Sequence, residues 1–348
     1  MRKIKVLIID DSALTRSILK EIIGSDKRIE IVGTAFDPIM ALDKIPRLKP
    51  DVLTLDLVMP KMDGITFLKK LSKENPIPTI LISGNSPKDS SNAIQALENG
   101  AIEIIEKPDI SNEGKYNEAK RTICDSIIAA SLSKRVPNKD INLGFLNKKK
   151  DVVKPLNAPS SQFYVVGAST GGPKLLNNMF SGISSTVKKG FVIAQHMPAG
   201  FTKSFAERMN DESDLWVVEA KDKEMIENGK VIIIPGGYHG VVKRGKDGFY
   251  INLTEETKVN GHRPSVDVLF ESAANVAGCS ATGILLTGMG NDGAKGLKML
   301  RDMGSYTMAQ DQMSSIVYGM PKAAMELDAV ELEASPLEIV QIINEHGE

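Results

Sequence analysis

The chain has 348 residues, of which 42% are hydrophobic and 25% are charged, and its formal net charge is −1 at pH 7. These values are typical of a globular protein with two or three domains, and they argue against a nucleic-acid binder, which normally carries a basic surface. The two cysteines, Cys124 and Cys279, fit neither a disulfide framework nor a zinc site. No apolar run has the length of a membrane span and the start of the chain does not fit a signal peptide, so we expect a cytoplasmic protein.

The first part of the chain, residues 1–133, alternates apolar runs with amphipathic segments. The runs predict strands at 5–9, 29–35, 51–56, 78–83 and 102–107. Apolar residues recur at helical spacing in 13–23, 38–48, 64–73, 92–100 and 115–134. This alternation predicts a doubly wound α/β domain with a five-stranded parallel sheet.

Polar side chains stand where these predicted strands end. Asp10 and Asp11 end the first, Asp56 the third, Ser83 the fourth and Lys107 the fifth. Functional groups of parallel sheets gather at the carboxyl ends of the strands. Three carboxylates would repel one another there unless a cation such as Mg²⁺ neutralised them. The first two aspartates also fit a simple helix cap, but the combination favours a site that holds a phosphoryl group on one aspartate.

Residues 3–130 resemble the receiver domain of bacterial response regulators, through the stretches IIDDS, LTLDLVMPKMDG, LISG and EKP. The resemblance implies that Asp56 accepts a phosphoryl group from a histidine kinase. It also implies two supporting sets: Mg²⁺ ligands at Asp10, Asp11, Asp56 and the Val58 carbonyl, and phosphoryl contacts from Ser83 and Lys107.

Residues 134–162 differ from the segments on either side. They are rich in Lys, Asn and Pro and have no sustained periodicity, which predicts a solvated linker between domains. Short apolar islands, such as INLGFL at 141–146, leave a docking role for this segment open.

A second alternating series follows in residues 163–348. Its apolar runs predict strands at 163–168, 190–196, 215–220, 230–236, 249–254, 282–289 and 306–310. Helical spacing appears at 173–183, 200–210, 265–277 and 293–303. We therefore expect a second α/β domain with a mainly parallel sheet.

The stretch VVGASTGGP, residues 165–173, contains a candidate catalytic serine. Gly167 to Gly171 fits G-x-S-x-G between a strand and a helix, the context of a nucleophile elbow centred on Ser169. The motif is short, so a helix cap formed by Ser169 or Thr170 is the alternative. A phosphate-binding loop is disfavoured because no hydroxyl residue follows Lys174.

A serine nucleophile needs a base and a carboxylate. His196 directly follows an apolar run and is the preferred base, whereas His239 comes after a glycine pair and is the alternative. Asp292 lies on a glycine-rich turn between a predicted strand and helix. Each of these residues also fits a structural role, as a buried histidine or a helix cap. Backbone amides of such a turn are suited to an oxyanion hole.

Residues 163 to about 342 resemble the catalytic domain of chemotaxis protein-glutamate methylesterases, through GASTGG, QHMP, GHRPSVDVLF and LLTGMGNDGA, and a receiver in front matches that family's domain order. The resemblance implies Ser169 as nucleophile, His196 as general base and acid, and Asp292 as the residue that orients it. It also implies that the backbone amides of Thr170 and Met289 form the oxyanion hole.

The resemblance implies a phosphorylation-activated esterase that hydrolyses glutamate γ-methyl esters on chemoreceptors and releases methanol, with glutamine deamidation as a second activity. Its partners would be chemoreceptors and the chemotaxis histidine kinase, without nucleic acid or membrane insertion. Mg²⁺ would be the cofactor of the receiver domain, and the esterase reaction would use no cofactor. His262 and Arg263 are candidates for the substrate rim. Two alternatives stay open: a phosphorylation-dependent adaptor without catalysis, and an amidase that uses the same triad.

Overall fold

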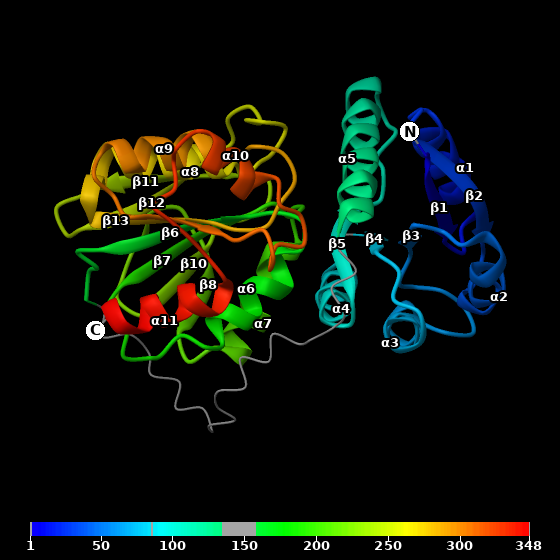
Figure 1. The fold of residues 1–348 in the computed structure, drawn as a ribbon, viewed down its shortest axis with the longest axis horizontal. Helices are drawn as coiled ribbons and strands as arrows, with labels where there is room; N and C mark the ends of the chain where they lie inside the picture. Colours follow the sequence, from blue (N-terminus) through cyan, green and yellow to red (C-terminus); the bar gives the residue numbers. More distant parts are fainter. Residues whose placement is uncertain (1, 85, 134–157, 348) are drawn as a thin grey trace. The chain divides into compact units, whose positions relative to one another are not determined.

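The computed structural model describes residues 2–84, 86–133 and 158–347, and the chain divides into two compact units, Met1–Pro137 and Asn138–Glu348 (Figure 1). Most of the predicted linker, residues 134–157, lies outside the described residues. Its last residues belong to the second unit by their contacts, because the Ser160 amide donates to the Ile226 carbonyl (3.0 Å) and Pro159 forms an antiparallel bridge with Glu227.

The first unit contains one five-stranded sheet in the order β2-β1-β3-β4-β5, with every neighbouring pair parallel. Its strands are β1 Ile4–Ile9, β2 Ile29–Ala35, β3 Val52–Leu55, β4 Thr79–Ser83 and β5 Ala101–Glu106. Its helices are α1 Ala13–Gly24, α2 Pro38–Leu48, α3 Gly64–Glu74, α4 Pro87–Glu98 and α5 Glu113–Leu132. The predicted doubly wound parallel domain is confirmed.

Helices cover both faces of this sheet. The pair α1 and α5 packs together on one side, and α3 and α4 pack together on the other (Figure 1). Because both faces are covered, the central strands are mostly apolar, and residues 6–9 of β1 are at most 1% exposed. The polar residues that follow β1 and β3 therefore mark the edge of the core.

The second unit has a seven-stranded sheet in the order β15-β14-β13-β6-β7-β10-β8, again parallel throughout. Its strands are β6 Phe163–Ala168, β7 Gly190–Gln195, β8 Trp216–Glu219, β10 Lys230–Ile233, β13 Ala281–Leu285, β14 Thr307–Gln310 and β15 Leu332–Ala334. A smaller antiparallel sheet, in the order β11-β12-β9, consists of β9 Glu224–Met225, β11 His239–Arg244 and β12 Phe249–Thr254. The mainly parallel α/β fold expected here is confirmed.

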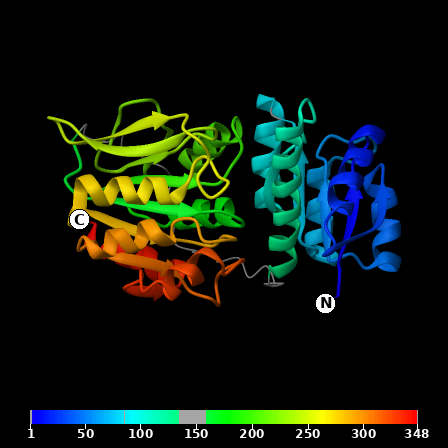
Figure 2. The same cartoon turned by 90° about the horizontal axis from the view of Figure 1, so that it is seen from above.

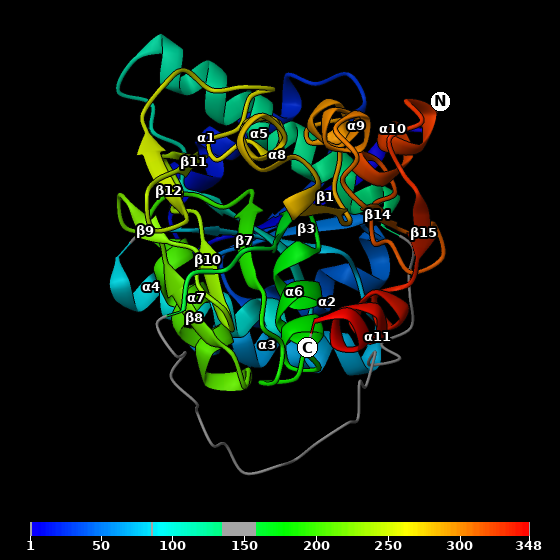
Figure 3. The same cartoon turned by 90° about the vertical axis from the view of Figure 1, so that its left-hand side faces the viewer.

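The helices of this unit form a layer on each face of the large sheet. They are α6 Gly172–Phe180, α7 Phe201–Glu212, α8 Val266–Ala277, α9 Ala294–Asp302, α10 Met320–Glu326 and α11 Pro336–His346, with a 3₁₀ turn at Gly278–Ser280. Helices α8, α9 and α10 lie on one face, and α6, α7 and α11 on the other (Figures 1 and 3). The small sheet packs beside α8 (Figure 2).

Several short elements differ from the expectation. Strands β9, β11 and β15 and helices α10 and α11 have no counterpart in the predicted series. His346 ends α11, whose start is stabilised by a capping box between Ser335 and Glu338. Within the described ranges, no helix is long and apolar enough to cross a membrane.

The strand order determines where the loops meet. Strand β6 is central, with β13 on one side and β7 on the other. Because all three strands are parallel, the segments that follow them emerge at the same edge of the sheet. These segments begin at Ser169 after β6, at His196 after β7 and at Leu286 after β13.

Gly167 in β6 allows α8 to approach this edge. A Cβ atom at residue 167 would lie 2.2 Å from Cγ1 of Val266 and 3.1 Å from Cδ1 of Leu285. We predict that Gly167→Ala lowers the free energy of unfolding of this unit by about 1–3 kcal/mol, because the core is overpacked. Gly245→Ala is the matched control, since its nearest contact would be an ordinary 3.4 Å. Chemical denaturation measures both, and equal stability of the two variants would contradict this packing role.

Candidate active site

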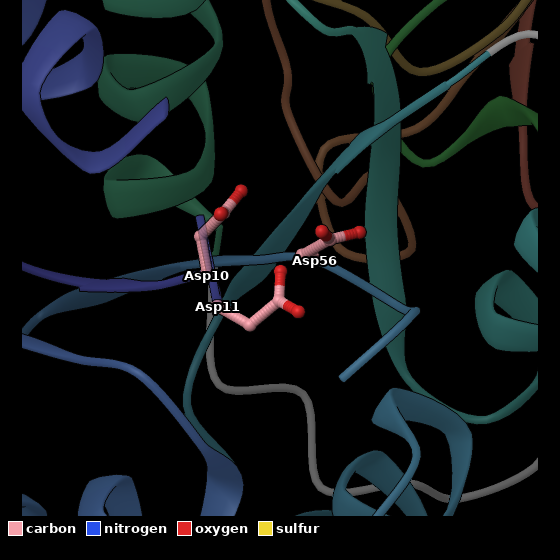
Figure 4. Close-up of side chains that lie close together, drawn as sticks. All are labelled: Asp10, Asp11 and Asp56. Atoms are coloured by element: carbon pink, nitrogen blue, oxygen red, sulfur yellow. The ribbon is translucent and has the colours of Figure 1, made fainter. Parts of the chain in front are cut away.

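Three carboxylates gather at the carboxyl edge of the five-stranded sheet of the first unit (Figure 4). Asp10 and Asp11 follow β1, Asp56 follows β3, and one ligand oxygen from each lies within 4.8 Å of the others. Asp10 and Asp56 are buried, while Asp11 is exposed. The Oδ2 atom of Asp10 is buried without a hydrogen-bond partner. An acidic cluster with an unsatisfied oxygen suits a hard cation such as Mg²⁺.

Lys107 brings a positive charge to this cluster. Its Nζ lies 2.6 Å from Oδ2 of Asp56 and 3.7 Å from Oδ2 of Asp10, and its amide donates to the Ser83 carbonyl (2.9 Å). Burial raises the pKa of Asp10 to about 6 even though Lys107 opposes the shift. The Val58 amide donates to Oδ1 of Asp56 (3.3 Å). The structure thus brings the predicted residues to one edge, and the phosphoryl and metal contacts themselves stay predictions.

In the second unit, Ser169 stands on the turn between β6 and α6. Its amide donates to the Thr287 carbonyl (3.0 Å), and its own carbonyl accepts from the Gly172 amide (2.8 Å). The left-handed residue of the turn is Gly171, with φ of 79°. A Cβ atom at Gly171 would also collide with Ile316 at 2.6 Å. Both the left-handed backbone and the lack of space therefore require glycine at this position.

Ser169, His196 and Asp292 form one hydrogen-bonded chain, although they come from three separate loops. Nδ1 of His196 lies 3.0 Å from Oγ of Ser169, and Nε2 lies 2.8 Å from Oδ2 of Asp292. The side chain of His196 is only 5% exposed. An ionised Asp292 accepts, so Nε2 carries the imidazole proton and Nδ1 is left to accept from the serine hydroxyl. This arrangement can activate a serine nucleophile.

Asp292 is 2% exposed, yet both of its oxygens are fully hydrogen-bonded. The donors to Oδ1 are Asn260 Nδ2 (2.7 Å), Ser265 Oγ (2.8 Å) and the Asp267 amide (3.3 Å); those to Oδ2 are His196 Nε2 and the Val266 amide (2.7 Å). Two of the donors are amides of the first turn of α8, where the helix dipole favours an anion. Burial would raise the pKa of Asp292, but these bonds, led by His196, hold it below its usual value.

Gln195 fastens the first two loops to each other. Its Nε2 donates to the carbonyl oxygens of both Ser169 and His196, at 3.0 Å each, and the residue is 1% exposed. The position where a Cβ atom of Gly172 would stand lies 2.1 Å from Oε1 of Gln195, so only glycine fits there. One buried amide therefore links the loop that carries the serine to the loop that carries the histidine.

The turn after β13 passes directly beside Ser169. A Cβ atom at Gly288 would stand 2.7 Å from Cβ of Ser169. Met289, one of the two predicted oxyanion-hole residues, is the next residue, and Thr170 follows the serine itself. The amides of these two residues thus belong to segments that flank the serine, and their role as oxyanion donors stays a prediction.

The remaining predicted residues lie on the segment before α8. The ring of His262 stacks on that of His196, with centroids 3.7 Å apart and planes 6° apart. Arg263 donates through one guanidinium nitrogen to the carbonyls of Glu255 and Glu256. His239, the alternative base, does not reach the serine: its Nε2 donates to the Thr257 carbonyl and its Nδ1 accepts from the Ser265 amide.

Comparison with known proteins finds matches to both units. Residues 164–343 match the model of the CheB methylesterase family, and residues 6–114 match that of the response regulator receiver domain. A protein-glutamate methylesterase/protein-glutamine glutaminase of Geobacter metallireducens is 42% identical over 335 residues, which cover 94% of each chain. One from Syntrophus aciditrophicus is 42% identical over 347 residues, covering 99% of this chain and 100% of the relative.

The chain belongs to the CheB methylesterase family. The crystal structure of the Thermotoga maritima CheB methylesterase catalytic domain is 33% identical and has a TM-score of 0.52, covering 56% of this chain and 99% of that one. The protein is a response-regulator methylesterase/glutaminase that acts in chemotactic adaptation. The family, the enzyme class and the two-part fold predicted from the sequence are confirmed.

Three residues of this methylesterase site were not among the candidate site residues drawn from the sequence. They are Asn260, Gln195 and Ser265, the last of which caps α8 and also donates to Asp292. The Asn-Gly pair at 260–261 was a readable turn signal. The acceptor that an amide side chain binds depends on loops that are distant in the sequence, so no local sequence pattern predicts it.

The buried Gln195 amide provides a test of this arrangement. We predict that Gln195→Leu lowers the free energy of unfolding by about 1–3 kcal/mol, because two buried carbonyls lose a donor. Ester hydrolysis should fall as well, because the two loops lose their link. Gln341→Leu, an exposed position on α11, is the control. Denaturation and methanol release by the purified variants measure both effects; a Gln195→Leu variant as stable and active as the control would refute this role.

Proposed function

We propose that this methylesterase hydrolyses glutamate γ-methyl esters on chemoreceptors through Ser169, His196 and Asp292, and that phosphorylation of Asp56 activates it. The observation that carries the proposal is the continuous chain of hydrogen bonds from the serine hydroxyl to a buried carboxylate, at 3.0 and 2.8 Å. We further propose that the protein works in the cytoplasm, recruited to chemoreceptor clusters, as its family membership suggests.

Acylation begins when Oγ of Ser169 attacks the side-chain carbonyl carbon of the methyl ester and its proton passes to Nδ1 of His196. Asp292 stabilises the imidazolium through its bond to Nε2. Backbone amides of Thr170 and Met289 receive the oxyanion of the tetrahedral intermediate. The intermediate collapses as the C–O bond to methoxide breaks, and His196 returns its proton to give methanol.

Deacylation repeats these steps with water. His196 removes a proton from the water that attacks the acyl carbon, then returns it to Oγ of Ser169 as the bond breaks. The products are a glutamate carboxylate and free enzyme. A glutamine side chain forms the same acyl-enzyme with loss of ammonia, which accounts for glutaminase activity at the same site. We propose that Arg263, which directly follows His262 in the sequence, faces the acidic surface of the receptor.

In the receiver unit, we propose that Asp10, Asp11, Asp56 and the Val58 carbonyl hold Mg²⁺. The unsatisfied Oδ2 of Asp10 and the cluster of carboxylates support this assignment. The cation would neutralise the charges that otherwise repel an incoming phosphoryl group. Lys107, already 2.6 Å from Asp56, and the neighbouring Ser83 would then contact the phosphoryl oxygens. The phosphodonor is the chemotaxis histidine kinase.

Removing the nucleophile tests the catalytic assignment. Ser169→Ala should lower kcat for methyl-ester hydrolysis by roughly 10³-fold or more, because the covalent route is lost. Methanol release from methylated receptor measures kcat, and Ser185→Ala, an exposed serine of the same unit, is the control. Methanol release by Ser169→Ala at the rate of the control would rule out the assignment.

Removing the phosphorylation site tests the control of the enzyme. With Mg²⁺ and a small phosphodonor such as acetyl phosphate, we predict that the wild type is activated and that Asp56→Asn is not. Without the phosphodonor, the two proteins should have the same basal rate. Asp43→Asn, an exposed aspartate of α2, should respond like the wild type. Full activation of Asp56→Asn, or equal activation of the wild type after Mg²⁺ is chelated, would contradict the mechanism.

A further inference from the structure

The stack of His262 on His196 is a contact that the proposed hydrolytic steps do not use. The two rings lie 3.7 Å apart at the centroids and are parallel within 6°. His262 comes from the segment between β12 and α8, and His196 from the end of β7. Among the described residues, none forms a hydrogen bond with the ring of His262. Stacking is therefore the specific contact that this ring makes at the site.

A tight turn holds His262 in place. Val259 and His262 exchange both backbone hydrogen bonds, at 3.2 and 2.9 Å. The two residues between them, Asn260 and Gly261, have φ values of 53° and 83°, the left-handed pair of a type I′ turn. The same turn directs the Asn260 side chain to Oδ1 of Asp292 (2.7 Å). One turn thus contacts two members of the triad, the carboxylate and the imidazole.

This turn is anchored on both sides, through residues 255–257 before it and residues 263–265 after it. His239 binds the Thr257 carbonyl and the Ser265 amide, at 3.1 and 3.2 Å. Arg263 binds the Glu255 and Glu256 carbonyls through its guanidinium, while its own carbonyl accepts from the Gly237 amide (3.0 Å). The turn that carries His262 is therefore fixed, and the stacked ring is held against a rigid support.

The geometry of the triad leaves one motion of the base to be restrained. Hydrogen bonds at Nδ1 and Nε2 hold the His196 ring at two points on its edge. Because Cγ of the ring is bonded to Cβ, the ring plane turns by rotation about the Cβ–Cγ bond, and the two hydrogen bonds oppose small rotations only weakly because hydrogen bonds tolerate bending. A flat group pressed against one face of the ring opposes this motion directly.

We propose that His262 is a positioning residue for the hydrolytic reaction, whose stacked ring fixes the plane of the His196 imidazole between Ser169 and Asp292. The inference rests on the proposed function, because it requires His196 to be the base. His262 is not assigned a proton-transfer step, since its ring is bonded to neither the serine nor the carboxylate.

The stack is compatible with the charge that His196 acquires during the reaction. Burial, followed by the proximity of His196, lowers the pKa of His262 to about 3. At neutral pH the second ring is thus uncharged, and the imidazolium faces a neutral aromatic surface and not another cation. A neutral aromatic face attracts a cation, so the contact persists when His196 is protonated.

The test compares flat and non-flat replacements of His262 in the full-length protein. His262→Phe keeps a planar ring, whereas His262→Leu and His262→Ala do not. We expect His262→Leu and His262→Ala to lower kcat by about 10- to 100-fold with KM changed less than about threefold, because misplacement of the base affects the chemical step. His262→Phe should recover most of kcat. His346→Ala, at the far end of α11, is the control.

A second readout separates positioning of the base from recognition of the receptor. The rate at which a fluorophosphonate labels Ser169 depends on the activated serine but not on glutamyl binding. It should fall in His262→Leu by the same factor as kcat, and His262→Phe should restore it. Thermal unfolding identifies any variant that does not fold, and the comparison of Phe with Leu then decides the outcome.

Three results would overturn the proposal: wild-type kcat in His262→Leu and His262→Ala, equal impairment of His262→Phe and His262→Leu, or a loss confined to KM. The last would make His262 a substrate-rim residue. Failure of the proposed function is distinguishable, because it would appear as full activity in His196→Ala. An inactive His196→Ala together with fully active His262→Ala would remove the positioning role alone.

Discussion

The catalytic half of this protein depends on one constraint: Asp292 is a buried carboxylate that must stay ionised. A buried charge is tolerated only when it is fully hydrogen-bonded, and Asp292 accepts from five donors. These donors come from the end of β7, the turn at Asn260 and the start of α8. Satisfying one side chain thus joins the end of β7 and the segment at residues 260–267 to the loop that carries Asp292, and the orientation of His196 follows from that junction.

Both units use the carboxyl edge of a parallel sheet, but they treat buried charge differently. The receiver gathers Asp10, Asp11 and Asp56 around Lys107, burial raises the pKa of Asp10, and Oδ2 of Asp10 has no hydrogen-bond partner. The methylesterase unit surrounds its aspartate with donors, so the pKa of Asp292 is lowered. The first arrangement suits a cation, and the second suits the support of an imidazolium.

Sequence patterns were sufficient to predict the long helices and strands and the functional residues that follow the central strands. Ser169 and His196 follow the runs at 163–168 and 190–195, and parallel topology brings such ends together. Strand β9 has two residues and β15 three, too few for a pattern, and their pairing depends on neighbours already in place. The contacts of Gln195 and the stack of His262 could not be predicted from the sequence either, because each is a side-chain contact between segments that only the folded chain brings together.

The most direct test of the account is the tautomer of His196, read from the ¹⁵N shifts of the ring nitrogens in histidine-labelled protein. The chain has four histidines, and His196→Gln assigns the signal. The account predicts that at neutral pH Nε2 carries the proton, facing an ionised Asp292, and that Nδ1 is unprotonated toward Ser169. A proton on Nδ1 with an unprotonated Nε2 would contradict the central claim, because the carboxylate would then not orient the base.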